Sequence, residues 1–262
     1  MHRRVADAQE RLSLKTQVSE LAVTGAEPAF RDVIHVGRPN IGDRQRLFQR
    51  FNDLLDRRWL TNNGQYVQEF ERCVASRAGV RHCVAVSSGT LGLEIAIRAL
   101  GLSGEVIVPS FTFVATVHAL QWQGITPVFC DVDPLTHRLD YRRVEERITS
   151  RTTGILGVHL WGGPCSIDQL TEIARTHRLK LLFDAAQAFG SSYKGRMIGN
   201  FGEAEIFSFH ATKFVNAFEG GAVVTNDDAL AARVRLMRNF GFRGIDDAVC
   251  VGTNAKDRKS VV

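Results

Sequence analysis

The sequence predicts an α/β domain: an α/β/α sandwich whose seven-stranded, mostly parallel sheet lies between layers of helices. From residue 83 onward, short apolar runs alternate with helix-like segments, an order typical of parallel sheets buried on both faces. The last two runs lie close together in the chain, so we expect the sheet to be mixed. The predicted strands are Cys83–Val86, Glu105–Val108, Pro127–Cys130, Ile155–His159, Lys180–Phe183, Glu205–Phe209 and Ala222–Thr225.

The part of the chain before the first strand shows a different pattern. Residues 1–33 have weak periodicity and are expected to form a loose arm, with room for a short helix. Pro39 and Gly42 mark a turn, after which Asp43 is a candidate N-cap for the first strong helix. The apolar residues that recur at helical spacing in this helix are Leu47, Phe48, Phe51, Leu54 and Leu55.

Helix patterns also follow the first two predicted strands. The segment LGLEIAIRAL follows the first strand and TFVATVHALQWQG follows the second. A further helix is expected around Asp227–Arg238, after the last strand. This regular alternation supports a sheet with helices on both faces.

The composition is that of an ordinary globular protein, with 44% hydrophobic and 23% charged residues in 262. No apolar run approaches the roughly 20 residues that cross a bilayer. The basic first residues lack the apolar core of a secretory signal, so we expect a cytoplasmic protein. The net charge is +5, but no basic stripe with interleaved aromatics accompanies it. Nucleic acid is therefore not an expected partner, whereas a small molecule with a phosphate would suit the positive balance.

The five cysteines do not indicate a metal site or a disulfide framework. Their number is odd and no pair has the C-x-x-C spacing. Cys83 and Cys130 lie in apolar, strand-like runs, where cysteine behaves as a small hydrophobic residue. We therefore expect buried free thiols at these two positions.

Polar residues follow several of the predicted strands, which is where ligands bind in sheets of this kind. The turn Ser87–Thr90 follows the first strand and leads into a helix, so its N–H groups would suit a phosphate. An ordinary strand-to-helix turn with Thr90 as the N-cap explains the same residues. Phe111 and Phe113 follow the second strand, and one ring could cover a flat heterocycle, although aromatics at such positions are usually part of the core.

The fifth and sixth strands are followed by candidate chemical groups. Asp184 is either the cap of a following helix or the partner of a protonated ring nitrogen, since a buried carboxylate needs a cation. Lys213 lies in a loop of small residues, a position that is more often solvent-exposed than catalytic. The phosphate turn, aromatic ring, aspartate and lysine stand in this order on successive strand ends. Together they describe a site for pyridoxal phosphate.

Several sequence blocks carry a resemblance to a known family. In order, they are IHVGRPNIGDR, SSGTLGLEIAI, VPSFTFVATVHAL, PVFCDVDP, GVHLWGGPCSID, FDAAQAFGS and, most specific of all, FSFHATKFVNAFEGGAVVTND. With these blocks the chain resembles the DegT/DnrJ/EryC1/StrS sugar aminotransferases, of the aspartate-aminotransferase-like type I fold. The resemblance covers nearly everything from Ile34 to Lys256, and the family's seven-stranded sheet matches the strands predicted above.

The resemblance implies roles for matched positions. Lys213 matches the lysine that binds the cofactor covalently and later moves the proton. Asp184 matches the carboxylate on the pyridine nitrogen, Gln187 the partner of the ring hydroxyl, and Phe113 the aromatic stacked on the ring. His159 and Trp161 lie close to the site without an assigned role. The phosphate cradle is matched by Gly89, Thr90 and Ser208.

The resemblance also implies an activity. Glutamate would donate an amino group, through the cofactor, to a nucleotide-linked keto-deoxy sugar, either a 4-keto-6-deoxyhexose or a 3-keto relative. Of these we expect a dTDP-4-keto-6-deoxyhexose. A dehydrating branch of the family has histidine in place of the lysine, so Lys213 speaks against that branch. A homodimer is expected from the family. The alternative is a truncated paralogue or gene fragment that binds the cofactor without turnover.

The sequence departs from the family near its C-terminus. The block VGTNAK matches the family, whereas DRKSVV, residues 257–262, does not. Relatives continue into a smaller domain on the order of 100 residues. The expected organisation is therefore an arm at 1–33, a cofactor-binding large domain at 34–256 and a non-family tail at 257–262, with the small C-terminal domain largely missing.

Overall fold

The computed structural model describes residues 16–28, 30, 32, 35 and 37–256. The predicted tail, 257–262, lies outside these residues. The chain forms two compact units, Met1–Arg38 and Pro39–Val262. In the described part of the first unit, two short 3-10 helices follow one another, η1 (Val18–Glu20) and η2 (Ala22–Thr24). No helix within the described residues is long and apolar enough to cross a membrane.

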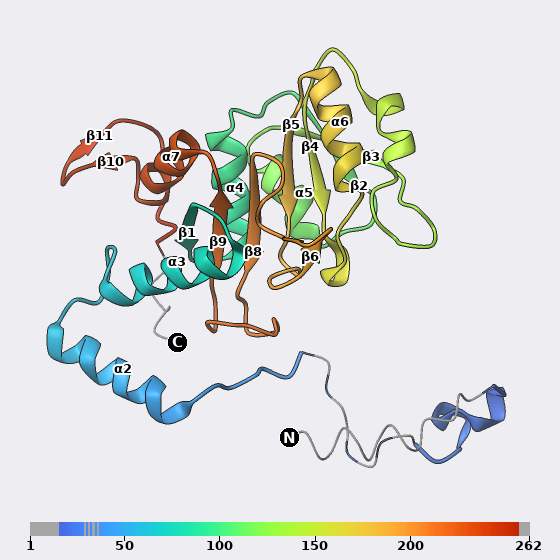
Figure 1. Cartoon of the computed structure of the whole chain (residues 1–262), viewed down its shortest axis with the longest axis horizontal. Coiled ribbons are helices and arrows are strands. Elements are labelled where there is room, and N and C mark those ends of the chain that lie inside the picture. The colour runs from blue at the N-terminus through green and yellow to red at the C-terminus, as the bar shows by residue number, and fades with distance from the viewer. Residues whose placement is uncertain (1–15, 29, 31, 33–34, 36, 257–262) are drawn as a thin grey trace. The chain divides into compact units, whose positions relative to one another are not determined.

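The second unit is built on a seven-stranded sheet with the strand order β1-β9-β8-β5-β4-β2-β3 (Figure 1). β9 runs antiparallel to both of its neighbours, and the other pairs are parallel. The predicted mixed, mostly parallel sheet is therefore confirmed. The strands are β1 (His82–Val86), β2 (Glu105–Pro109), β3 (Thr126–Cys130), β4 (Thr152–Val158), β5 (Lys180–Asp184), β8 (Ala204–Ser208) and β9 (Gly221–Thr225).

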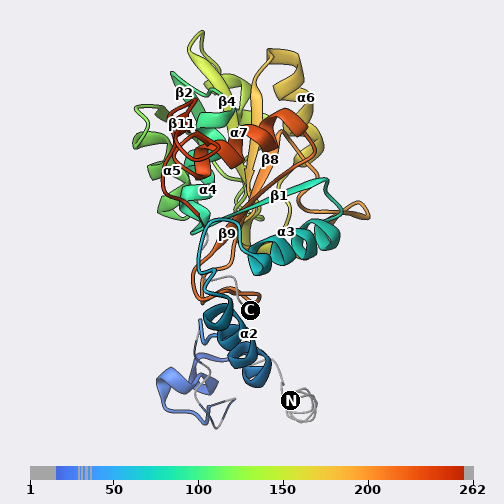
Figure 2. The ribbon, with the colours of Figure 1, turned by 90° about the vertical axis from the view of Figure 1, so that its left-hand side faces the viewer.

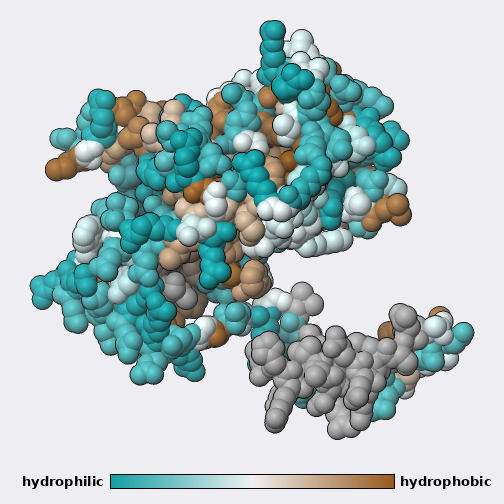
Figure 3. Space-filling view, in the orientation of Figure 1, coloured by the Kyte–Doolittle hydropathy of each residue, from teal (hydrophilic) through white to brown (hydrophobic). Residues whose placement is uncertain are grey.

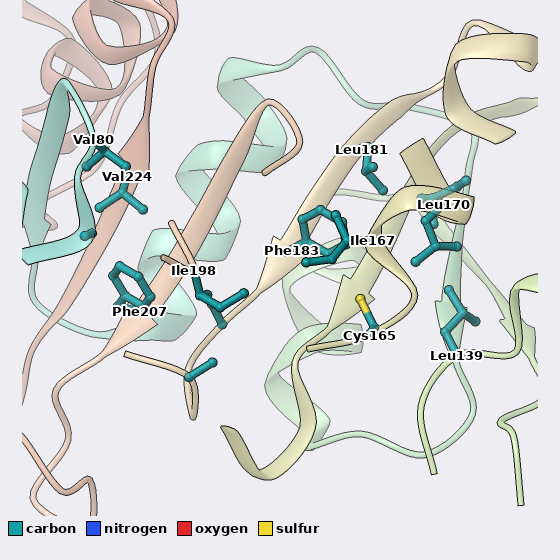
Figure 4. Close-up of a cluster of buried hydrophobic side chains, with 14 of the residues drawn as sticks. Val80, Leu139, Cys165, Ile167, Leu170, Leu181, Phe183, Ile198, Phe207 and Val224 are labelled. Atoms are coloured by element: carbon teal, nitrogen blue, oxygen red, sulfur yellow. The ribbon is translucent and has the colours of Figure 1, made fainter. Parts of the chain in front are cut away.

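Helices cover both faces of the sheet, which gives three layers (Figures 1 and 2). Successive side chains of a strand point to opposite faces, so each strand contributes to two cores. On β5, Leu181 and Phe183 join one core, shown in Figure 4, and Leu182 joins the other. The first core includes residues of α3 (Gln65–Ala78) and α6 (Ile167–His177), and the second those of α4 (Gly89–Ala99), α5 (Val114–Gln121) and α7 (Asp228–Arg238).

Short polar side chains begin three of the described α-helices by accepting a free N–H group of the first turn. The Arg46 N–H donates to Asp43 at the start of α2 (Arg44–Arg57), as predicted. Asp227 caps α7 in the same way. The prediction for α4 was wrong, because Ser88, and not Thr90, is the N-cap and accepts from the N–H of Leu91.

Two short hairpins stand outside the main sheet and were not predicted. They are formed by β6 (Ser192–Tyr193) with β7 (Arg196–Met197), and by β10 (Phe242–Arg243) with β11 (Asp247–Ala248). Strands of two residues are too short to show a periodic pattern. The tip of the second hairpin carries Ile245, which is 95% exposed, and this end of the molecule shows apolar colour in Figure 3.

The last described residues return to the edge of the sheet. The Ser87 N–H donates to the carbonyl of Ala255 at 2.9 Å, and Val86 forms a bridge with Lys256. Cys83 and Cys130 are buried, as predicted from their apolar surroundings.

Candidate functional site

A cavity of about 370 Å³ lies at the carboxyl edge of the sheet and brings the predicted site residues together. Its wall includes residues from the ends of β4, β5 and β8, from the turn after β1 and from the starts of α4 and α5. All seven predicted residues line it: Gly89, Thr90, Phe113, Asp184, Gln187, Ser208 and Lys213.

The turn from β1 into α4 forms one wall of the cavity through close backbone packing. The first turn of a helix leaves N–H groups without intrahelical partners, and the helix dipole adds positive potential there. A Cβ on Gly89 would lie 3.2 Å from Cβ of Ser208, so glycine lets β8 approach the turn. A Cβ on Gly221 would lie 2.5 Å from the carbonyl carbon of Ser88. The turn therefore offers exposed N–H groups between two close strands, an arrangement suited to an anion.

Asp184 is the acidic group at the floor of the cavity, where its residue is only 6% exposed. The Thr116 hydroxyl donates to its Oδ2 at 2.8 Å and the Ala186 N–H to its Oδ1 at 3.0 Å. Burial raises the pKa of this carboxyl, while those two hydrogen bonds and the charge of Lys213 act in the opposite direction. No helix follows Asp184, so the alternative role as a helix cap is excluded.

Lys213 lies in the loop between β8 and β9, half-buried at the cavity. Its N–H donates to the carbonyl of His210, whose ring nitrogen Nδ1 is 2.8 Å from the Thr212 hydroxyl. His210 also pairs with Glu219 across the loop at 3.4 Å. Within the described residues, no hydrogen bond or ion pair engages the Lys213 amine, and its charge acts on Asp184.

The remaining two predicted residues face the cavity from different loops. Phe113 is the N-cap residue of α5 and is 72% exposed, so its ring has a face available for a flat ligand. Gln187 follows β5, and its Oε1 accepts the N–H of Trp161 at 2.7 Å. Since the amide oxygen is engaged, the Gln187 amide nitrogen is the part left to donate to a ligand.

His159 and Trp161, which the sequence placed near the site, occupy different environments. His159 is buried, with its ring stacked on Phe183 at 4.8 Å and its Nε2 3.1 Å from Oε2 of Glu205. Trp161 is 67% exposed and makes edge contacts with Phe111 and His137.

Three residues at or next to the cavity were not assigned a role from the sequence: Thr116, which donates to Asp184, and the pair of His210 with Glu219. Thr116 is fully buried on α5 and lies one turn after Thr112, whose hydroxyl is 2.8 Å away. The available signal was a pair of threonines four residues apart, one just before the helix and one in its first turn. Asp184, which accepts the hydrogen bond from Thr116, is 68 residues further along the chain, so no local pattern shows this contact.

A larger cavity, of about 490 Å³, lies beside β1 and away from these residues. Several cations line it: Arg72, Arg81, Arg235, Arg238 and Lys256. Arg238 is engaged with Glu71 at 2.6 Å and with the carbonyl of Ala85. The smaller cavity, by contrast, combines carboxylate, amine, amide and hydroxyl groups. Among the described residues, no cluster of three metal-ligating side chains occurs.

Comparison with known proteins defines the class to which this fold and site belong. Residues 42–256 match the DegT/DnrJ/EryC1/StrS aminotransferase family. The chain belongs to this family.

Two relatives and one solved structure show how similar the chain is to other proteins. The chain is 40% identical over 210 residues to GDP-perosamine synthase of Caulobacter vibrioides, covering 79% of this chain and 56% of that protein. It is 36% identical over 223 residues to dTDP-4-amino-4,6-dideoxy-D-glucose transaminase of Shigella dysenteriae, covering 85% and 61%. The structure of DesI, solved in the presence of its TDP-sugar product, is similar with a TM-score of 0.85 and 53% identity, covering 94% and 62%. The chain therefore spans less than two thirds of the length of each.

Proposed function

We propose that this chain binds pyridoxal phosphate through Lys213 and transfers an amino group from glutamate to a nucleotide-linked keto sugar. One observation carries the proposal: a helix N-terminus, a buried carboxylate and an unengaged amine line the same cavity of about 370 Å³. Each group has the chemistry to hold a different part of this cofactor. Within the proposed organisation, residues 34–256 form the cofactor-binding domain, preceded by an arm at 1–33 and followed by a tail at 257–262.

The phosphate would lie at the start of α4. The N–H groups of Gly89 and Thr90 stand at the positive end of the helix, and the Ser208 hydroxyl lies beside them. A Cβ on Gly89 would contact Ser208 at 3.2 Å, so the lack of this atom keeps the cradle open. An anion would therefore be bound largely by backbone groups.

The ring nitrogen would face Asp184. This carboxylate is buried with two hydrogen-bond donors, and burial without a paired cation is costly. A protonated ring nitrogen would supply that cation, and Asp184 would in turn hold the proton on the nitrogen. Phe113 would cover one face of the ring, and the amide nitrogen of Gln187 would donate to the ring oxygen.

The amine of Lys213 would attach the cofactor covalently and, when released, would move a proton on its Nζ. Pyridoxal phosphate supplies an electron sink for the negative charge left when a proton leaves the carbon beside an amine. Asp184 supports that role because it stabilises the positive charge of the ring.

We further propose that the acceptor is a dTDP-linked 4-keto-6-deoxyhexose. Support comes from DesI, at 53% identity with a TDP-sugar product, and from a relative named as a dTDP-4-amino-4,6-dideoxy-D-glucose transaminase. A relative named for a GDP-linked sugar provides the competing acceptor. Amination assays with dTDP- and GDP-linked 4-keto sugars compare the two directly, and a preference for GDP would refute the choice of nucleotide. A cytoplasmic homodimer completes the proposal, and sedimentation analysis tests the dimer.

Absorption spectroscopy tests the cofactor proposal on the 262-residue chain. Adding pyridoxal phosphate is expected to produce a new visible band, and borohydride reduction followed by peptide mass mapping is expected to locate the label on Lys213. Lys213→Ala should lose both the band and the label. Lys180→Ala, at the opposite end of β5, is the control that should keep them.

Glutamate then separates catalysis from binding. A band that disappears when glutamate is added supports an active half-reaction. A band that does not change supports the alternative, a chain that binds the cofactor without turnover. If no band forms, or if Lys213→Ala keeps it, the proposal for Lys213 is wrong.

A further inference from the structure

A buried pair beside the cavity joins Glu205, on β8, to His159, which directly follows β4 and is one of the residues that line the cavity. Both side chains are completely buried. Oε1 of Glu205 accepts the N–H groups of Gly199 at 2.8 Å and Phe201 at 2.7 Å, and its Oε2 lies 3.1 Å from Nε2 of His159. Buried carboxylates require donors of this kind, so His159 supplies the third donor that Glu205 needs.

The hydrogen bonds of His159 select one tautomer. The Cys165 N–H donates to Nδ1 at 3.2 Å, so this nitrogen presents its lone pair. The proton therefore lies on Nε2, where it donates to Glu205. The imidazole thus connects a fixed carboxylate on one side with the backbone of Cys165 on the other.

These contacts hold both ends of the segment His159–Cys165, here called the 159–165 loop. Arg138 supports the same loop, because its Nη1 donates to the carbonyl of Pro164 at 2.7 Å. A Cβ on Gly163 would lie 1.9 Å from Nη2 of Arg138, so the guanidinium packs directly on the loop backbone. Inside the loop, Trp161 adopts left-handed backbone angles, φ 51° and ψ 34°.

The shape of the loop aims one N–H group at the cavity residue Gln187. The N–H of Trp161 donates to Oε1 of Gln187 at 2.7 Å. Gln187 is otherwise an exposed side chain with rotatable bonds. This single contact fixes which end of its amide faces the ligand.

We propose that Glu205 and His159 are positioning residues which, through the 159–165 loop, direct the amide nitrogen of Gln187 toward the ring oxygen of the cofactor. The inference rests on the proposed function, because it takes Gln187 as a cofactor contact. Neither Glu205 nor His159 needs to touch the cofactor for this role.

Glu205→Gln is the most direct test, since it preserves size and removes one acceptor. Two N–H donors already occupy one end of the new amide, so its NH₂ group would face the Nε2–H of His159. To avoid this clash the imidazole must change tautomer, which turns a proton toward the N–H of Cys165. The 159–165 loop is then expected to shift and release Gln187.

The readout is the pH midpoint of the visible absorption change of the lysine-bound cofactor. A donor at the ring oxygen stabilises that oxygen as an anion and disfavours proton uptake, so losing the donor should raise the midpoint. We expect Gln187→Ala and Glu205→Gln to raise it by about one pH unit, a tenfold change in proton affinity. The double variant Glu205→Gln/Gln187→Ala should match Gln187→Ala alone, because the pair acts through Gln187.

Glu203→Gln is the matched control. Glu203 also accepts a backbone N–H, that of Leu181, but at the opposite end of β5. It should leave the midpoint unchanged. If Glu205→Gln also leaves the midpoint unchanged while Gln187→Ala raises it, the positioning role is refuted and the proposed function stands.

A second variant covers the case in which Glu205→Gln does not fold. Gly163→Ala leaves the buried pair intact but places a Cβ where the Arg138 guanidinium lies, so Arg138 must leave the carbonyl of Pro164 and the loop loses this support. The midpoint should then rise in the same direction. An unchanged midpoint in Gly163→Ala would overturn the inference. Absence of the visible band in the unmodified chain would instead refute the proposed function itself.

Discussion

Replacing Gly221 with alanine tests whether close backbone packing shapes the turn that we propose binds the phosphate. Gly221 begins β9 and pairs with Val86 on one side and Ser208 on the other. An added Cβ would lie 2.5 Å from the carbonyl carbon of Ser88 and 2.6 Å from the nitrogen of Gly89. Both neighbours are backbone atoms, so reaching an ordinary separation of about 3.5 Å requires the turn to move by about 1 Å. Overpacking of this kind costs roughly 1–3 kcal/mol.

The same displacement should weaken binding of the cofactor, because the N–H groups at the start of α4 move with the turn. Urea unfolding of the cofactor-free Gly221→Ala chain should show a free energy of unfolding that is lower by roughly 1–3 kcal/mol. This corresponds to a Tm that is lower by roughly 2–12 °C. The Kd for pyridoxal phosphate should rise about tenfold.

Gly220→Ala is the adjacent control for this prediction. Its Cβ would lie 3.5 Å from Cβ of both Ala217 and Phe209, an ordinary contact. The free energy of unfolding of Gly220→Ala should stay within about 0.5 kcal/mol of that of the unmodified chain. If Gly221→Ala unfolds at the same urea concentration as Gly220→Ala and binds the cofactor equally well, close packing at this turn supports neither stability nor cofactor binding, and the prediction is wrong.

Three further changes address the charge, a helix cap and the buried thiols. Asp184→Asn should still bind the cofactor but lose kcat by on the order of a hundredfold or more, because the ring nitrogen loses its charged partner; near-normal kcat would contradict this. Asp227→Ala removes the acceptor of the Leu230 N–H and should lower the free energy of unfolding by about 1 kcal/mol, measured in urea. Burial raises the pKa of Cys130 from 9.0 to about 11, so iodoacetamide at pH 8 should label exposed Cys73 first, as mass mapping would show. The thiol of Cys130 ionises at a lower pH in the unfolded chain than in the folded one, so the free energy of unfolding should fall as the pH rises from 9 to 11. Early labelling of Cys130 by iodoacetamide would argue against its burial.

The sheet could be predicted because strands buried on both faces require continuous apolar runs. The segment Glu105–Val108, for example, has no alternating polar position after its first residue, and β2 is buried throughout. Parallel order then placed the ends of the strands at one edge, so Asp184 and Lys213 could be expected to meet there. Residues far apart in sequence were thus brought together by a general property of the fold.

Local capping was harder to predict because neighbouring residues compete for the same role. Ser87, Ser88 and Thr90 all have a hydroxyl that could cap α4, and only the backbone angles decide among them. Ser88 is the extended residue, with φ −160° and ψ 161°, and its side chain accepts the Leu91 N–H. Thr90 is already inside the helix, which leaves it to face the cavity.

The pair of Glu205 with His159 could not be predicted at all. The partners are 46 residues apart, and a glutamate at the start of a predicted strand usually lies at the solvent-exposed end. In the structure, β8 begins one residue earlier, at Ala204, and Glu205 lies opposite Phe183 inside the sheet. Because the strand begins one residue earlier than predicted, the Glu205 carboxylate is buried inside the sheet and does not lie at its solvent-exposed end.

Asp184 and Glu205 show how a carboxylate held by the fold differs from one that we propose binds a ligand. They lie on neighbouring strands, and because Glu205 pairs with Phe183, the residue before Asp184, the two carboxylates point to opposite faces of the sheet. Glu205 has three donors from the chain itself and is sealed from solvent. Asp184 has two donors, faces a cavity and lies near the unengaged amine of Lys213. One carboxylate is thus satisfied by the fold, while the other is left with capacity for a cation, as expected of a group whose partner arrives with the ligand.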